Sequence, residues 1–389
     1  MKSTRRDFIK KGTSLAAFSA AGIGSAGLAV LSGRKNSNQT KKTELSGTQK
    51  GVVWPVTESP ATPKLCIYTS RNADEAEMKM IKQIGIDYVL MSGSQTPWKE
   101  TDLRATMDRF SAAGLTVINM MIGGMQKTIY GREGRDDEIG KIQESLRAAG
   151  AAGLPVVEYN FYANRLVDGY YAMEGRSGTG YTAFDYEPVK DLPPKPEIGI
   201  HNSEELWNNL SYFLKAVIPV AEKAGVRMAL HPNDPPVPVS RGSDQIMATL
   251  NGWKRLIEIV DSPSNGITYD CGVTRELGED PVEVCRYFAT RDRINHAHFR
   301  NVRVEKPYIK YAEVFPDEGQ VNMFEVMREL VRNRYKLGIF PEHQRALDYD
   351  KAQTGDIQRS SYPGGGGYAG LTYNVAYARA MLQAALSMK

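Results

Sequence analysis

Two histidines and two acidic residues each close a short apolar segment in the second half of the chain. His231 follows RMAL, Asp270 follows GITY, His298 follows INHA and Glu342 follows GIFP. Imidazole and carboxylate ligands together suit Mn²⁺, Fe²⁺, Co²⁺ or Zn²⁺, whereas Mg²⁺ and Ca²⁺ prefer sites made of oxygen alone. The pattern therefore predicts a divalent metal site with these four residues as ligands.

Two of these assignments have a competing neighbour. His296 and His298 are two residues apart on one predicted strand, so both face the same way and one lies deeper. We choose His298 because it is nearer the end of the strand. Asp270 and Cys271 are adjacent, so only one of them can point inward. The alternative for Cys271 is a packed thiol.

Ligands at four successive strand ends require a sheet that brings those ends together. Apolar segments of strand length alternate with helical patterns along the chain. The predicted strands are 64–69, 87–92, 116–121, 155–161, 227–231, 266–271, 294–299 and 337–341. The predicted helices are 72–84, 101–113, 136–152, 203–224 and 321–335, and the first four precede a glycine, a common helix stop.

Eight strand–helix units predict an α/β fold, a closed (β/α)₈ TIM barrel whose catalytic groups lie at the C-terminal ends of the strands. The alternative is an open, doubly wound parallel sheet. It is weakened because no predicted strand is followed by a GxGxxG turn.

The N-terminal segment has a different composition from the rest. Arg5-Arg6 precedes a run of Ala, Gly and Ser, which is typical of a twin-arginine signal peptide. We predict a signal at 1–33, a polar linker at 34–62 and a catalytic domain at 63–389. We expect twin-arginine export to the periplasm, with no stable membrane span after signal removal. The alternative, a permanent anchor, requires a more apolar run.

Charge and cysteine content narrow the function classes. The chain has 49 Lys and Arg against 45 Asp and Glu, a net charge of +4. Residues 1–33 hold five of the basic residues and one acidic residue, which accounts for the whole excess. The remaining chain offers no basic surplus for nucleic acid. Three cysteines do not make a disulfide framework.

Several longer motifs resemble the mannonate dehydratase family. They are FLKAVIPVAEKAGVRMALHPNDPP at 213–236, HFRN at 298–301, EVFPDEGQVNMFEVMREL at 313–330, VVEYNF at 156–161, PEH at 341–343 and GYAGL at 367–371. The resemblance covers residues from about 155 to 380. It implies a xylose-isomerase-like barrel, a divalent metal that is usually Mn²⁺, and a hydro-lyase of hexuronate catabolism. The implied reaction removes water from D-mannonate to give 2-dehydro-3-deoxy-D-gluconate.

The resemblance also implies roles for particular residues. His343 and Tyr368 correspond to the acid and base groups of the family, and we expect Arg300 to offset the charge of the substrate. The chain departs from the family pattern at three places. Asp270 stands where the family usually has Cys, and Glu342 where it has Asp. The segment INMMIGGMQKT at 118–128 lacks the Glu and His that the family carries after its third strand.

The remaining polar residues at the strand ends are candidates for substrate binding. We assign Asn233, Asp234, Asn301 and Glu158 to this role. A metal-dependent sugar isomerase or epimerase is the alternative function, with Glu158 and Glu342 as paired carboxylates that exchange a proton. A non-catalytic sugar-binding barrel is a second alternative. The expected partner is a small sugar acid or sugar, and a homo-oligomer stays open.

Overall fold

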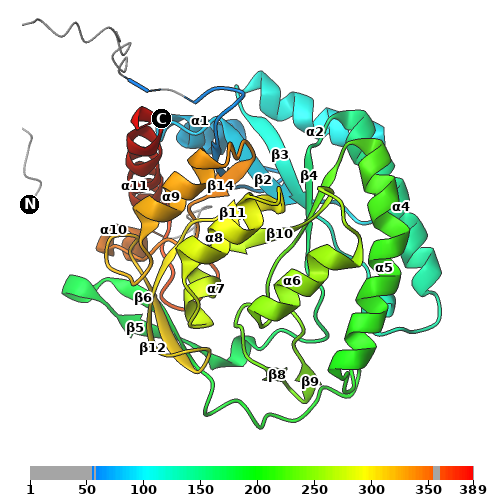
Figure 1. Cartoon of the computed structure of the whole chain (residues 1–389). Coiled ribbons are helices and arrows are strands. Elements are labelled where there is room, and N and C mark those ends of the chain that lie inside the picture. The colour runs from blue at the N-terminus through cyan, green and yellow to red at the C-terminus, as the bar shows by residue number, and fades with distance from the viewer. Residues whose placement is uncertain (1–54, 57, 354–359, 389) are drawn as a thin grey trace, which may run out of the picture. The chain divides into compact units, whose positions relative to one another are not determined.

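Eight parallel strands close into a barrel at the centre of the molecule (Figure 1). The computed structural model describes residues 55–56, 58–353 and 360–388. In chain order the barrel strands are β1 (Lys64–Tyr68), β2 (Tyr88–Ser92), β3 (Thr116–Met121), β4 (Val156–Tyr159), β7 (Arg227–Leu230), β10 (Asn265–Asp270), β11 (Ile294–His298) and β14 (Gly338–Phe340). Neighbours in this order are paired, and β14 closes the barrel against β1. The predicted TIM barrel and all eight predicted strands are confirmed.

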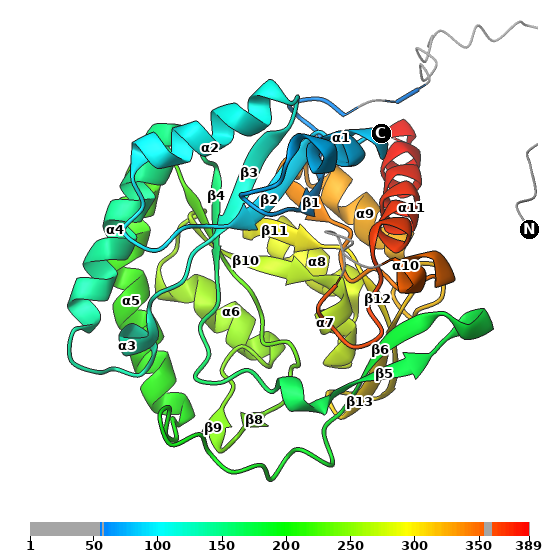
Figure 2. The ribbon, with the colours of Figure 1, turned by 180° about the vertical axis from the view of Figure 1, so that it is seen from behind.

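Helices cover the outside of the barrel (Figure 2). They are α1 (Glu75–Gln83), α2 (Glu100–Ala112), α3 (Gln126–Ile129), α4 (Arg135–Ala152), α5 (Ser203–Ala224), α6 (Leu250–Ile259), α7 (Cys271–Glu276), α8 (Pro281–Ala289), α9 (Met323–Arg332), α10 (Asp348–Ala352) and α11 (Tyr368–Ser387). Two short 3₁₀ helices are η1 (Val167–Gly169) and η2 (Arg176–Gly178). The five predicted helices are among these. Gly153 and Gly225 end α4 and α5 in the left-handed conformation that glycine adopts without strain.

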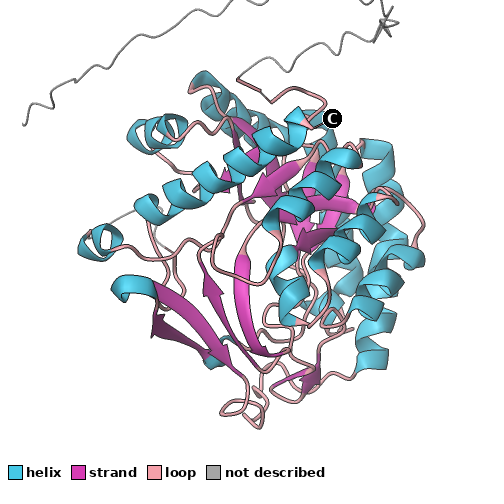
Figure 3. Cartoon of the chain, turned by 60° about the vertical axis from the view of Figure 1, so that its left-hand side comes forward, coloured by secondary structure: helices cyan, strands magenta, loops and turns pink. Residues whose placement is uncertain are grey.

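A second sheet, which the sequence analysis did not predict, lies beside the barrel (Figure 3). It is antiparallel, with the order β12 (Asn301–Lys306), β13 (Lys310–Val314), β6 (Gly180–Asp185) and β5 (Tyr170–Glu174). One hairpin lies in the connection from β4 to β7, and the other in the connection from β11 to β14. We call it the side sheet. A small hairpin of β8 (Val239–Ser240) and β9 (Ser243–Asp244) follows β7.

Apolar packing holds these parts together. One large cluster of buried residues fills the space between the strands and the helix layer. A smaller cluster joins the side sheet to the loop after β7 through Tyr170, Phe184, Tyr311 and Val237. Both clusters fix the loops at the C-terminal ends of the barrel strands, where the polar residues gather.

Two predictions concern the ends of the chain and the membrane. The predicted signal at 1–33, and all but a few residues of the predicted linker at 34–62, lie outside the described residues. Of the helices that the structure describes, none is long and apolar enough to cross a membrane. The three cysteines are buried and form no disulfide with one another.

Candidate metal and active site

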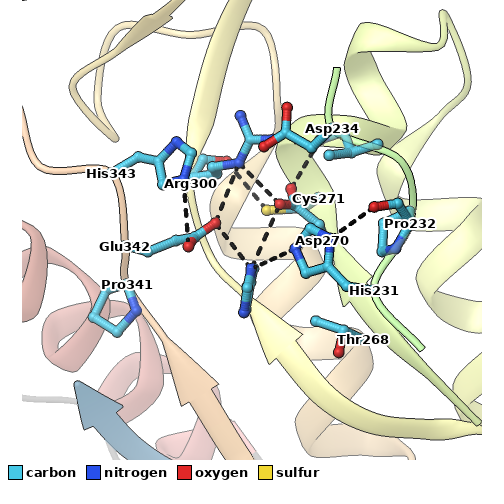
Figure 4. A network of polar contacts seen from close by, with 12 residues as sticks. His231, Pro232, Asp234, Thr268, Asp270, Cys271, Arg300, Pro341, Glu342 and His343 are labelled. Carbon is cyan, nitrogen blue, oxygen red and sulfur yellow. Dashed lines mark hydrogen bonds and ion pairs between the residues drawn. The ribbon is translucent and has the colours of Figure 1, made fainter. Parts of the chain in front are cut away.

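Four side chains meet at the C-terminal ends of consecutive barrel strands β7, β10, β11 and β14 (Figure 4). The central atom is Nδ1 of His298, the last residue of β11. It lies 3.2 Å from Nε2 of His231, 2.9 Å from Oε1 of Glu342 and 3.7 Å from Oδ2 of Asp270. The structure therefore brings together all four residues predicted as metal ligands.

The local structure shows which residue of each neighbouring pair, Asp270 or Cys271 and His296 or His298, faces the cluster of four side chains. Cys271 begins α7, and its thiol donates to the carbonyl oxygen of Arg300 at 3.2 Å. Asp270 places Oδ2 toward His298, while its Oδ1 accepts the backbone N–H of Val273 and caps α7. His296 lies deeper, and its two ring nitrogens make no hydrogen bond within the described residues.

The four side chains fit a divalent metal. His231, Asp270 and His298 form a set whose ligand atoms lie within 4.8 Å of one another. Oε1 of Glu342 is buried and makes no well-aligned hydrogen bond within the described part of the chain, although Nδ1 of His298 is 2.9 Å away. Glu342 therefore lies within reach of an ion bound by the other three residues. Two imidazoles and two carboxylates would suit a transition-metal ion.

The carboxylates of this cluster are held in their charged form. Burial alone would raise the pKa of Asp270, but Arg300 and His298 hold it well below its usual range. Burial likewise opposes ionisation of Glu342, and His298 and His343 lower its pKa in net terms. Both groups are therefore deprotonated at neutral pH, as metal ligands must be.

Arg300 lies behind the cluster, where it contacts several carboxylates. The side chain is 2% exposed, and its Nε donates to Oδ2 of Asp270 at 2.9 Å. Its Nη1 donates to Glu276 in α7 at 2.6 Å. It is not among the residues that line the cavity in front of the cluster. The prediction that Arg300 neutralises the substrate is therefore corrected: Arg300 neutralises the carboxylates beneath the site.

A cavity of about 560 Å³ opens in front of the four side chains. Its size is typical of a site for a small ligand. Glu158, His231, Asp234, His298, Glu342 and His343 reach its wall. So do Tyr362 and Arg165, and the sequence analysis did not single out Arg165. Both lie in long connections between elements, whose paths short-range patterns do not predict.

His343 is a titratable group at the wall of this cavity. Its Nδ1 lies 2.8 Å from Oε2 of Glu313, in β13 of the side sheet, and its Nε2 lies 3.5 Å from Oε2 of Glu342. Arg345 donates to the same Glu313 oxygen at 2.8 Å. Burial lowers the pKa of His343, and Glu313 and Glu342 raise it in net terms above its ordinary value. Glu313 is a functional candidate that the sequence analysis missed.

Tyr368 does not reach the cavity. It begins α11, and its hydroxyl donates to the carbonyl oxygen of Met80 in α1 at 2.9 Å. The prediction that Tyr368 is an acid or base group is therefore corrected, because its hydroxyl joins two outer helices. Tyr362 lies at the cavity wall instead, with its ring centroid 5.0 Å from that of His343.

The two predicted asparagines are structural. Asn233 donates to the side-chain oxygen of Gln245 at 2.9 Å and accepts the N–H of Met247 at 2.8 Å. Asn301 donates to the carbonyl of Pro316 at 2.7 Å and accepts the N–H of Val321 at 2.9 Å. Neither lines the cavity, so their assignment to substrate binding is corrected: their amides brace loops.

Asp234 and Glu158 do line the cavity. Asp234 accepts the hydroxyl of Tyr170 at 2.6 Å and pairs with Arg165 at 3.3 Å. Glu158 lies on the inner side, where it accepts Thr268 and Asn119, each at 2.8 Å. Its Oε1 is 3.6 Å from Nε2 of His298. Glu158 therefore supports the inner edge of His298, opposite the edge that faces the other ligands.

A closed eight-stranded parallel barrel, with two imidazoles and two carboxylates at the C-terminal ends of four of its strands, defines a TIM-barrel protein. The crystal structure of D-psicose 3-epimerase from Clostridium cellulolyticum H10 shares this fold. Its TM-score is 0.54 at 12% identity, over 82% of this chain and 99% of that one.

Other comparisons are more specific. The family model described as D-mannonate dehydratase (UxuA) matches residues 198–388. Mannonate dehydratase of Streptococcus equi subsp. zooepidemicus is 32% identical over 249 residues, 58% of this chain and 68% of that protein. The Thermotoga petrophila enzyme is 29% identical over 324 residues, 72% and 89% of the two chains. The crystal structure of mannonate dehydratase from Streptococcus suis serotype 2 has a TM-score of 0.72 at 27% identity, over 83% of this chain and 95% of that one.

This chain belongs to the mannonate dehydratase family. The resemblance inferred from HPNDPP and GQVNM is thereby confirmed. Membership of this family favours a hydro-lyase over the isomerase or epimerase alternative.

Proposed function

We propose that this protein is a metal-dependent hydro-lyase that converts D-mannonate to 2-dehydro-3-deoxy-D-gluconate and water. The observation that carries the proposal is the convergence of His231, Asp270, His298 and Glu342 beside a cavity of about 560 Å³, in a chain of this family. The reaction breaks the C2–H and C3–O bonds of the acid. The enol that results becomes the 2-keto group.

The metal proposed for this site is Mn²⁺, with Fe²⁺, Co²⁺ and Zn²⁺ as alternatives that the same ligands accept. His231, Asp270, His298 and Glu342 would hold it. When bound, such an ion polarises substrate oxygens and makes the neighbouring C–H bond more acidic. Glu158 and Arg300 orient two of these ligands, because they contact His298 and Asp270 from behind.

Proton transfer is assigned to His343. Glu313 lies against Nδ1, so the neutral ring carries its proton there and presents Nε2 as the basic nitrogen. This nitrogen lies 3.5 Å from Oε2 of Glu342, and both residues line the cavity. It can take the proton from C2 and supply one to the departing C3 hydroxyl. Arg165, at the cavity wall beside Asp234, offers a positive charge to the substrate.

A product assay tests this function. The purified protein is incubated with Mn²⁺ and D-mannonate, and the 2-keto-3-deoxy acid is detected by its colour with periodate and thiobarbiturate. We expect colour that requires both the metal and His343, with the variant His343→Ala as the matched control. Absence of colour, together with interconversion of a free ketose, would support the isomerase alternative instead.

We also propose that the protein is exported through the twin-arginine pathway to the periplasm. The support is Arg5-Arg6 followed by a run of small residues. Cell fractionation of the full chain tests this. The wild type should be recovered from the periplasm, and the double variant Arg5→Lys, Arg6→Lys from the cytoplasm. Equal distribution of the two proteins would reject the proposal.

A further inference from the structure

A second cavity adjoins the one that holds the candidate metal site. It has a volume of about 540 Å³ and lies over the ends of β2, β3 and β4. The two cavities share four wall residues, Ser92, Met121, Asn160 and Tyr162. The first cavity alone is within the ~300–1,000 Å³ that small-ligand sites occupy. A six-carbon acid therefore does not need the second.

The two cavities differ in charge. The first presents Glu158, Asp234, Arg165 and histidines. The described residues that line the second include no Asp, Glu, Lys, Arg or His. They offer amides, hydroxyls and backbone, for example at Gln95, Thr96 and Gln126. Such a surface suits a neutral ligand with many hydroxyl groups better than a second carboxylate or a phosphate.

Polar groups at the junction are available to a ligand. Within the described residues, the side-chain amide of Asn160 has one weak contact, to the sulfur of Met121 at 3.8 Å. The hydroxyl of Tyr162 has no hydrogen bond to any described residue. A Tyr at a concave site provides an apolar ring face and a hydrogen-bonding hydroxyl, and an Asn amide donates and accepts hydrogen bonds. These two residues lie where a ligand would pass from one cavity to the other.

Three glycines, Gly93, Gly123 and Gly124, lie in the wall of the second cavity. Gly93 must be glycine, because a Cβ atom there would lie 2.1 Å from the ring of Trp98. Gly124 has a φ of +82°, which side chains rarely adopt. Gly123 is different, since a Cβ atom there would meet no heavy atom within 4 Å. The wall at Gly123 therefore has room for a larger side chain.

We propose that the second cavity binds a neutral sugar unit joined by a glycosidic bond to the aldonate, on the end away from its carboxylate. The substrate class is then a glycosyl-aldonate rather than the free acid alone. Elimination at C2 and C3 leaves the glycosidic bond intact. This inference rests on the proposed dehydration of an aldonate in the first cavity.

The test compares two acids on one protein. The probes are D-mannonate and the mannobionate obtained by oxidising the reducing end of 1→6-linked mannobiose. The variant Gly123→Leu adds a side chain that projects into the second cavity, and its backbone lies outside the left-handed region. Gly140→Leu is the matched control, because Gly140 in α4 has equally open surroundings and lies outside both cavities.

We expect the wild type to have a kcat/KM for mannobionate at least about tenfold above that for mannonate, a ratio worth about 1.4 kcal/mol. Gly123→Leu should reduce this ratio at least tenfold, and Gly140→Leu should keep it. A wild type that converts mannonate but rejects mannobionate overturns the inference. So does a ratio that Gly123→Leu leaves unchanged.

If neither acid is converted, the proposed function fails. Calorimetry then measures the affinities of the two acids and tests separately whether the second cavity binds a sugar unit. Mannobionate should bind the wild type at least tenfold more tightly than mannonate, and Gly123→Leu should abolish the difference. Equal affinities of the two acids for the wild type would reject the subsite.

Discussion

At the scale of single residues, the sequence predicted the side chains that close barrel strands but not those in long loops. Asp270, His298 and Glu342 could be found because a parallel strand ends where its apolar run ends. Arg165 could not, because its position depends on packing against a distant segment that contains Tyr362. Tyr368 was placed wrongly for the same reason: its hydroxyl direction is set by α1, not by the neighbouring glycines.

The metal site can be tested at Asp270. We expect Asp270→Asn to lose bound metal and to lower kcat/KM for mannonate by about 100-fold or more, since a carboxylate ligand is replaced by a neutral amide. Asparagine retains the cap of α7, because it is as good an N-cap residue as aspartate. Metal content by mass spectrometry and steady-state kinetics give the two readouts.

Cys271→Ser is the control for this substitution. Its side chain faces the carbonyl oxygen of Arg300, so it should keep the metal. If Cys271→Ser loses the metal while Asp270→Asn retains it, the ligand assignment is wrong.

Glu313 is expected to act through His343. Glu313→Gln removes the charge against Nδ1, so we expect kcat to fall by about 10- to 100-fold, the range typical of groups that orient a functional histidine. KM for mannonate should change little, because Glu313 is not among the residues that line the cavity. A variant with an unchanged kcat and a raised KM would show that Glu313 serves binding instead.

At the scale of elements, the barrel strands were predictable and the side sheet was not. The barrel strands are short apolar runs, each followed by a helix pattern. β12 (NVRVEK) is half exposed and charged, and β5 (YYAME) is mostly exposed, so neither shows such a run. The two hairpins join through β13 and β6, which are far apart in sequence: Tyr311 lies opposite Phe184. Local patterns carry no signal for such pairing.

The junction of α11 and α1 provides a prediction at this scale. Tyr368→Phe removes the hydrogen bond to Met80, so we expect the free energy of unfolding to fall by about 1 kcal/mol. The turnover of mannonate should stay as in the wild type, because the hydroxyl does not reach the cavity. Denaturant unfolding and steady-state kinetics measure the two quantities. A large loss of kcat with unchanged stability would instead support a role for Tyr368 as an acid or base group in the active site.

At the scale of the whole molecule, buried carboxyl groups are concentrated at one end of the barrel. Six carboxylates are buried there, at Glu158, Asp234, Asp270, Glu276, Glu313 and Glu342. Arg300 and Arg345 are the arginines buried among them, and the candidate metal ligands lie at the same end. A divalent cation would reduce the remaining repulsion, so metal binding and stability should be linked.

Metal removal tests this link. Treatment with a chelator should lower the melting temperature and abolish turnover, and added Mn²⁺ should restore both. At a free metal concentration 100 times the dissociation constant, the expected stabilisation is about 2.7 kcal/mol. Thermal unfolding at a series of metal concentrations measures it. A melting temperature that is independent of metal would contradict a site inside the folded barrel.

The side sheet has a consequence for the order in which the molecule can be assembled. Its two hairpins come from connections on opposite sides of β7, β10 and β11 in the sequence, and Glu313 reaches His343 only from the second. Bringing them together closes a long loop, which carries an entropic cost that nearby contacts cannot offset early. We therefore expect the side sheet, which holds Glu313 against His343, to form late in folding.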